Sequence, residues 1–212
     1  MPKDIIVVGA SAGGLEALRV IVGALPADLS ASLFIVMHTA PDAPGILADI
    51  LNLAGRLTAK SAKDNELIRP GTIYVAPPDR HLLIEATVVR VTLGPGENRF
   101  RPAIDPLFRS AAQTYGPRVV GVILTGYLDD GTAGLLMVKQ MGGTAIVQDP
   151  SDALVPFMPQ NALDHVNVDY CLPINEIAPL LVRLSETVAD SLIVGAPLRG
   201  RPRLFIGPRS SD

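Results

Sequence analysis

Short, continuous apolar segments recur along the chain and alternate with segments of helical periodicity. Continuous apolar runs are typical of parallel strands, because helices bury both faces of their sheet. Apolar residues spaced three and four positions apart indicate helices instead. By these criteria the sequence predicts strands at 5–8, 33–37, 72–76, 119–124 and 144–147, and helices at 15–22, 44–53, 106–115, 133–141, 159–164 and 174–188.

One pair of predicted strands has a different spacing. Segments 82–85 and 88–93 are separated by only Ala86 and Thr87, which is typical of an antiparallel hairpin. Elsewhere strands and helices alternate, and this order favours a parallel sheet built by crossover connections. We therefore expect an α/β fold, with a mostly parallel, Rossmann-like sheet, helices on both of its faces and one antiparallel hairpin.

The composition agrees with a single core. Of the 212 residues, 48% are hydrophobic, which is enough for one sizeable domain. Only 4% are aromatic and none is tryptophan, so Val, Ile, Leu and Ala must fill the interior. We expect a catalytic domain over residues 1–190. The remainder, 191–212, is rich in Arg, Gly and Pro and is expected to form a flexible tail.

Charge and cysteine content exclude several classes of function. A net charge of −3 gives no electrostatic reason to expect a nucleic-acid partner. No apolar run approaches the roughly 20 residues that span a bilayer, and no signal-peptide pattern opens the chain. Cys171 is the single cysteine, which fits a reducing compartment. We therefore expect a cytoplasmic protein without membrane insertion. The three histidines are dispersed, so neither a metal nor a cofactor is expected.

The turn after the first predicted strand carries a serine between glycines. Residues 9–13, GASAG, match the pattern G-x-S-x-G, which can place a nucleophilic serine at the rim of a sheet. The same turn could instead cap a helix through Ser11 or bind a phosphate. A dinucleotide site would need glycine at position 11 and an acidic residue after the second strand. The sequence has Met37 and His38 there, which disfavours a nucleotide.

Two further strands end in residues that can do chemistry. His38 follows the second predicted strand, and the strand at 119–124 leads into Asp129, Asp130 and a glycine. If these strands are neighbours, their carboxyl ends bring a serine, a histidine and a carboxylate to one edge. Nucleophilic acyl transfer needs that set, because histidine removes the serine proton and the carboxylate orients the imidazole. Each residue also has an ordinary structural interpretation, and the two aspartates compete for the carboxylate role.

Five segments in this order resemble the catalytic domain of the chemotaxis protein-glutamate methylesterases, the CheB family. They read VVGASAGGLEA (7–17), IVMH (35–38), IRPGTIYVAPPDRH (68–81), RPAIDPLFRSAA (101–112) and VILTGYLDDGTAG (122–134). The resemblance covers roughly residues 4–185. It implies a hydrolase that demethylates glutamate methyl esters on the cytoplasmic helices of bacterial chemoreceptors. Family members also deamidate receptor glutamines.

The resemblance also assigns roles to residues. The family's serine, histidine and aspartate fall on Ser11, His38 and Asp130, since the family's aspartate directly precedes a glycine. Backbone N–H groups at Ala12 and Tyr127 are the implied oxyanion donors. The order Ser, His, Asp differs from that of the α/β-hydrolases, which indicates a separate fold that converged on the same triad.

Two segments depart from the usual family pattern. Tyr127 and Leu128 stand where the family usually has methionine and glycine, which affects the expected oxyanion hole. Segment 39–45 lacks the usual Met-Pro, phenylalanine and arginine, so recognition of receptor helices is expected to differ. Typical members also carry an N-terminal receiver domain, whereas here the serine motif starts within ten residues of Met1. We therefore expect a stand-alone form, with a separate receiver protein as a partner.

Two other functions stay open from the sequence. The first is a non-enzymatic docking module that retains the triad, and the altered segments motivate it. The second is an esterase that acts on another protein or on a small ester. Covalent labelling of Ser11 by a serine-directed phosphonate separates the first from an enzyme, and methanol release from methylated receptor fragments separates the second from a receptor methylesterase.

Overall fold

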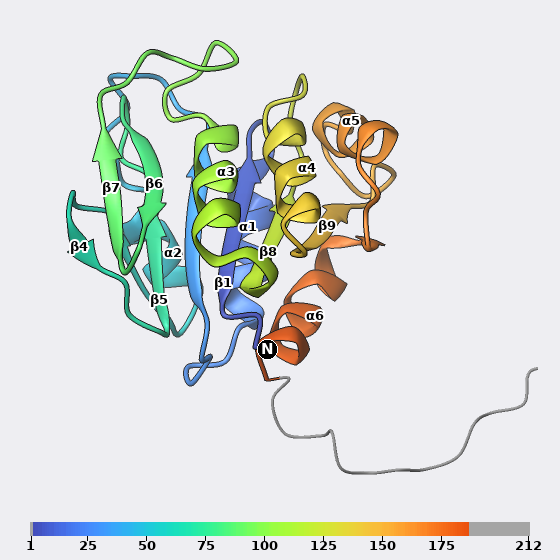
Figure 1. Cartoon of the computed structure of the whole chain (residues 1–212), viewed down its shortest axis with the longest axis horizontal. Coiled ribbons are helices and arrows are strands. Elements are labelled where there is room, and N and C mark those ends of the chain that lie inside the picture. The colour runs from blue at the N-terminus through green and yellow to red at the C-terminus, as the bar shows by residue number, and fades with distance from the viewer. Residues whose placement is uncertain (1, 187–212) are drawn as a thin grey trace, which may run out of the picture.

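A seven-stranded sheet forms the centre of the computed structural model, which describes residues 2–186 (Figure 1). The strand order is β10-β9-β8-β1-β2-β5-β3, and every neighbouring pair is parallel. The bounds of the strands are β1 Ile5–Ala10, β2 Ser32–Met37, β3 Thr58–Ser61, β5 Thr72–Val75, β8 Val119–Ile123, β9 Thr144–Gln148 and β10 Tyr170–Leu172.

Helices cover both faces of this sheet, as the continuous apolar strands predict. On one face lie α1 (Gly14–Ala24), α2 (Leu47–Ala54) and α6 (Ile174–Glu186). On the other lie α3 (Ile104–Tyr115), α4 (Thr132–Gln140) and α5 (Phe157–His165). Figure 1 shows α3 and α4 in front of the sheet. Successive side chains of a strand point to opposite faces. Accordingly, Ile6 and Val8 of β1 pack with the first set, whereas Ile5 and Val7 pack with the second.

A smaller antiparallel sheet contains the predicted hairpin. It has the order β4-β7-β6, with β4 at Glu66–Leu67, β6 at His81–Glu85 and β7 at Val88–Thr92. Leu82 and Ile84 of β6 belong to the same apolar core as Leu107 and Phe108 of α3. The hairpin therefore extends the core on the α3 side. The predicted fold class is confirmed.

The differences from prediction lie at short or polar segments. The sequence pattern missed β3, β4 and β10, whose residues read TAKS, EL and YCL, because partly exposed strands have no continuous apolar run. The helix predicted at 44–53 begins only at Leu47, after Gly45 with a φ of 69°. Ile46, which directly precedes the helix, is exposed.

The structure tests only some of the predictions for the C-terminal part of the chain, because it describes residues 2–186. The helix expected at 174–188 is α6, which is described to Glu186. The tail predicted at 191–212 lies outside the described residues, so the division into a domain at 1–190 and a tail stays a prediction. Within residues 2–186, no helix is long and apolar enough to cross a membrane.

Candidate active site

The three strands that carry the predicted site residues are neighbours in the sheet. β1 lies between β2 and β8, and its register with β2 pairs Ala10 with Met37. Ser11, His38 and the loop at 124–131 therefore follow strand ends that lie side by side at one edge. This is the carboxyl edge, where parallel sheets place their functional groups.

The Ser11 turn is shaped by backbone hydrogen bonds and a glycine. The Ser11 N–H donates to the Thr125 carbonyl (3.0 Å), and the Gly14 N–H donates to the Ser11 carbonyl (2.8 Å). Gly13 has a φ of 78°, a left-handed conformation that favours glycine, and a Cβ there would lie 2.9 Å from Leu154. Gly13 is also the N-cap of α1, which has no side-chain cap. Ser11 therefore does not cap the helix, and its hydroxyl is free for another partner.

That partner is His38. The Nδ1 atom of His38 lies 3.1 Å from Ser11 Oγ, and Nε2 lies 2.7 Å from Asp130 Oδ2. An ionised carboxylate can only accept, so we assign the ring proton to Nε2, which leaves Nδ1 to accept the serine proton. In the chymotrypsin arrangement Nε2 faces the serine and Nδ1 the aspartate. Here the two ring nitrogens exchange these positions.

Asp130 accepts four hydrogen bonds. Oδ2 receives the His38 Nε2–H and the Ile104 N–H (both 2.7 Å), whereas Oδ1 receives the Asn98 side-chain amide (2.7 Å) and the Asp105 N–H (3.2 Å). The two backbone donors belong to the first turn of α3, where the helix dipole also favours an anion. Burial by itself raises the pKa of Asp130, but the hydrogen bonds outweigh it and hold the pKa below its ordinary value. The carboxylate is therefore ionised at neutral pH.

Asp129 has no comparable environment. It is exposed, and its backbone carbonyl accepts the Thr132 N–H (3.0 Å) in the turn that leads into α4. Asp130 is buried, and Gly131 after it has a φ of 97°. The geometry thus brings together Ser11, His38 and Asp130, and it leaves Asp129 outside.

Backbone donors for an oxyanion were expected at Ala12 and Tyr127. Gly126 lies against the serine, since a Cβ on it would be 2.7 Å from Ser11 Cβ. The Gly126 N–H already donates to the Val155 carbonyl (3.0 Å). The N–H groups of Ala12 and Tyr127 have no acceptor among residues 2–186, so they can serve a substrate oxygen.

The Tyr127 side chain faces the surface. Its ring stacks on that of Phe157, with 5.9 Å between the centroids, and the residue is 54% exposed. The next residue, Leu128, has a φ of 66°. The departure from the family's usual methionine therefore leaves the backbone N–H of residue 127 available.

Two residues at the site have no signal in the sequence pattern. The ring of Phe100 stacks on the His38 imidazole, with 3.5 Å between centroids and 8° between planes. The Asn98 amide donates to Asp130, as described above. Both belong to the irregular segment between β7 and α3. Their only sequence cue is that they lie within the three residues before the family-like block at 101–112.

The other two histidines have structural contacts. His81 is buried, with Nε2 2.9 Å from the Pro95 carbonyl and Nδ1 3.3 Å from the Ala103 N–H. His165 ends α5 and contacts the Asn161 carbonyl (2.8 Å). In the part of the chain that the structure describes, no group of three or more His, Cys, Asp or Glu side chains could hold a metal ion.

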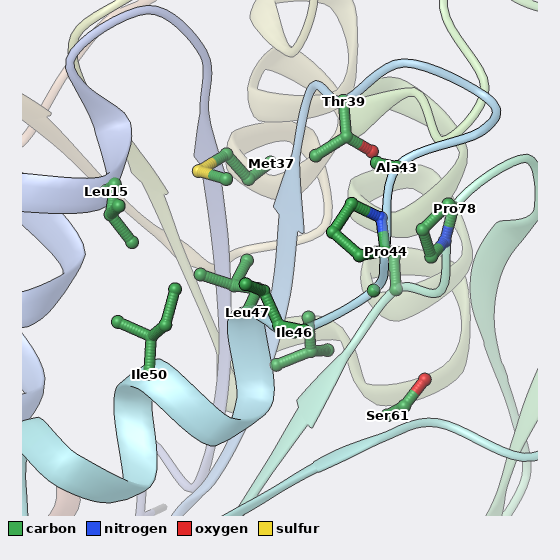
Figure 2. Close-up of a pocket in the computed structure, with 13 residues that line it drawn as sticks. Leu15, Met37, Thr39, Ala43, Pro44, Ile46, Leu47, Ile50, Ser61 and Pro78 are labelled. Atoms are coloured by element: carbon green, nitrogen blue, oxygen red, sulfur yellow. The ribbon is translucent and has the colours of Figure 1, made fainter.

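An apolar cavity of about 130 Å³ lies beside this edge of the sheet. Figure 2 shows it between α1, α2 and the segment that follows His38. Leu15 lies just after the serine turn, whereas Met37 and Thr39 flank the histidine, so the cavity adjoins the site. The remaining lining side chains include Ala43, Pro44, Ile46, Leu47, Ile50 and Pro78.

A parallel sheet covered by helices, with serine, histidine and aspartate joined by hydrogen bonds at its carboxyl edge, has the arrangement found in serine hydrolases. Comparison with known proteins identifies the family. The family described as CheB methylesterase matches residues 6–181. The chain therefore belongs to the CheB methylesterase family, and the fold and function class expected from the resemblance are confirmed.

Individual relatives agree. The chain is 40% identical over 187 residues to a putative protein-glutamate methylesterase/protein-glutamine glutaminase of Leptospira interrogans, covering 88% of this chain and 97% of that protein. It is 41% identical over 179 residues to protein-glutamate methylesterase/protein-glutamine glutaminase 1 of Geobacter metallireducens, covering 82% of this chain and 49% of that one. The crystal structure of the Thermotoga maritima CheB methylesterase catalytic domain superposes with a TM-score of 0.83 at 36% identity, covering 85% and 98% of the two chains.

Proposed function

We propose that this chain hydrolyses glutamate methyl esters on the cytoplasmic helices of bacterial chemoreceptors, with Ser11 as nucleophile, His38 as general base and acid, and Asp130 as the group that orients His38. The observation that carries the proposal is the chain of hydrogen bonds from Ser11 Oγ through both ring nitrogens of His38 to Asp130. A serine hydroxyl is a weak nucleophile until a base removes its proton, and this geometry supplies the base.

In the first half of the reaction Ser11 Oγ bonds to the ester carbonyl carbon while its proton passes to His38 Nδ1. The electron pair of the carbonyl moves onto oxygen, and the N–H groups of Ala12 and Tyr127 stabilise that oxyanion. When the tetrahedral intermediate collapses, the C–O bond to the methoxy group breaks. The departing oxygen takes the proton from His38 and leaves as methanol.

In the second half a water attacks the acyl-enzyme. His38 Nδ1 takes a proton from this water, whose oxygen bonds to the acyl carbon. Collapse of the second intermediate breaks the bond to Ser11 Oγ, which regains the proton from His38. The product is a glutamate side chain. A glutamine substrate follows the same steps with ammonia as the leaving group, which accounts for a glutaminase activity.

Asp130 works through His38 and stays ionised. Its carboxylate holds the Nε2–H, so the lone pair of Nδ1 points at the serine. It also stabilises the positive imidazolium that forms in each half-reaction. Phe100 covers one face of the imidazole, which limits the access of water to the ring.

The proposed substrate implies a cytoplasmic enzyme whose partners are receptor helices. A separate receiver protein is the expected regulatory partner, since family members typically join this domain to a receiver domain. The intact hydrogen-bond chain favours an enzyme over a docking module. These hydrogen bonds do not determine which ester is the substrate, so an ester on another protein or a small ester is the alternative.

Methanol release tests the proposal. The unmodified protein and Ser11→Ala are incubated with a panel of methylated receptor fragments and with a small methyl ester. We expect methanol from the receptor fragments and loss of at least about a thousandfold in the variant. Equal turnover by both proteins would refute the role of Ser11. Turnover of the small ester alone would replace the receptor as substrate.

A further inference from the structure

The side-chain amide of Asn98 lies between two buried carboxylates. Its Nδ2 is 2.8 Å from Asp105 Oδ2 and 2.7 Å from Asp130 Oδ1. A primary amide has two N–H donors, so each carboxylate receives one. Asn98 itself is exposed, whereas both aspartates are buried. The amide therefore closes this carboxylate pair from the solvent side.

The pair needs such a donor because like charges repel. Burial and the neighbouring charge of Asp130 raise the pKa of Asp105, which the hydrogen bonds from the Gly134 N–H (2.6 Å) and Asn98 oppose. Arg109 also faces Asp105 and is itself paired with Glu97. Of these contacts, only the Asn98 amide binds both carboxylates at once.

The loop that carries Asn98 also contacts His38. Asn98 and Arg99 have φ values of 49° and 73°, in the left-handed region that asparagine, aspartate and glycine adopt most readily. This turn directs the Phe100 ring onto the His38 imidazole. One short segment thus fixes two of the three groups of the site, the imidazole through Phe100 and the carboxylate through Asn98.

The end of the loop is anchored independently. The Arg101 guanidinium donates to Asp79 Oδ1 through Nε (2.8 Å) and Nη2 (2.6 Å), and Nη1 donates to the Gly94 carbonyl (2.9 Å). These bonds tie the two ends of the loop together without using the Asn98 side chain. Replacement of that side chain should therefore leave the loop in place.

We propose that Asn98 is a positioning residue, whose amide fixes the orientation of the Asp130 carboxylate and, through it, the direction in which His38 Nδ1 faces Ser11. The inference rests on the proposed hydrolase function. No contact of Asn98 with substrate is required, because it acts on the reaction through Asp130 and His38 alone.

Two variants at this position keep the left-handed backbone. Asn98→Asp has the same shape but replaces the N–H donors by a carboxylate, and Asn98→Gly removes the side chain. Asn65 provides matched controls, since it is exposed, has a φ of 62° and its amide has no hydrogen-bond partner among the described residues. The same two replacements there, Asn65→Asp and Asn65→Gly, alter charge and backbone freedom next to β4 in the smaller sheet.

The primary measurement is the rate constant for phosphonylation of Ser11 by a fluorophosphonate, because it reports the reactivity of the serine without the natural substrate. We expect both Asn98 variants to react roughly ten- to a hundredfold more slowly, as for loss of a hydrogen bond to a charged group. The kcat for methanol release should fall by a similar factor with KM unchanged. Asn98→Asp should also move the acid limb of the pH profile to higher pH, because it adds a third carboxylate beside Asp105 and Asp130.

Thermal melts distinguish positioning from a loss of structure. The inference would be overturned if the Asn98 variants were labelled at the rate of the unmodified protein. It would also be overturned if the decrease in labelling rate equalled the unfolded fraction of each variant and the pH profile did not change. If the unmodified protein is labelled but releases no methanol from receptor fragments, the proposed substrate is wrong, and the labelling rates still decide the role of Asn98. If the unmodified protein is not labelled, the serine is not activated and both proposals fail.

Discussion

The Nε2 atom of His38 lies 2.7 Å from Oδ2 of Asp130, and their side chains are only 4% and 0% exposed. Water therefore competes little for this hydrogen bond, and its strength depends on what else surrounds the carboxylate. Asp130 Oδ2 also accepts the N–H of Ile104, the first residue of α3. The same carboxylate therefore contributes both to the site and to the packing of the fold. Changes at Asp130 should consequently alter both catalysis and stability.

Asp130→Asn should lower kcat by about a thousandfold or more. The amide of asparagine cannot stabilise an imidazolium, and its NH₂ group can turn toward Nε2 and select the wrong tautomer. Methanol release and phosphonate labelling measure the loss. Asp129→Asn is the matched control, because Asp129 is adjacent in sequence and exposed, and it should keep near-normal rates. Comparable losses in both variants would contradict the assignment of Asp130.

The stability contributed by Asp130 should depend on pH in a defined direction. Burial alone would raise its pKa, but hydrogen bonds from His38, the Ile104 N–H and Asn98 outweigh that effect and lower it. A carboxyl whose pKa is lower in the folded state than in the unfolded state stabilises the fold while it is ionised. That stabilisation is fully present above the pKa of the unfolded state, about 3.9 for Asp, and is lost as the pH falls through the pKa of the folded state.

Urea unfolding of the unmodified protein and Asp130→Asn tests this direction. We expect the variant to be less stable by about 1–3 kcal/mol at pH 7, as for loss of hydrogen bonds to a charged group. The difference in the free energy of unfolding between the two proteins should shrink at pH 3, because the Asp130 carboxyl of the unmodified protein begins to be protonated there. A difference that grows toward low pH would show that the sign is wrong.

The sequence predicted the central part of this site because each residue follows a buried strand. Ser11, His38 and Asp130 lie after β1, β2 and β8, and apolar runs mark all three strands. The family resemblance decided between the two neighbouring aspartates, and the burial of Asp130 agrees with it. Asn98 and Phe100 could not be predicted, since their positions depend on an irregular loop whose path is set by tertiary contacts and not by periodicity.

Edge strands were missed for a related physical reason. A central parallel strand is buried on both faces and is therefore apolar throughout, whereas in β3 at Thr58–Ser61 only Ala59 is buried. A four-residue segment with one buried residue does not stand out from a loop in the sequence. The mostly parallel character of the sheet, in contrast, could be inferred, because alternating strands and helices favour crossover connections.

Gly13→Ala should be more harmful than the same change at another left-handed glycine. Gly13 (φ 78°) and Gly142 (φ 81°) have similar backbones, but a Cβ on Gly13 would lie 2.9 Å from Leu154, whereas one on Gly142 would have 3.7 Å to its nearest neighbour. We expect Gly142→Ala to cost about 1–2 kcal/mol from the backbone alone. Gly13→Ala should cost more and should also slow labelling of Ser11. Equal stability losses with normal labelling would show that the turn tolerates a side chain.

Leu128→Gly should stabilise the protein. Leu128 has a φ of 66°, which costs an L residue about 1–2 kcal/mol, and the family usually has glycine at this position. Glycine loses more backbone entropy on folding, which offsets roughly 0.5–1 kcal/mol, so we expect a net gain of up to about 1.5 kcal/mol in the free energy of unfolding. Leu93→Gly is the control, because Leu93 is also an exposed leucine but has no positive φ, and it should be neutral or destabilising. Equal losses of stability in the two variants would mean that the backbone at 128 is not strained, since only relief of that strain distinguishes the two replacements.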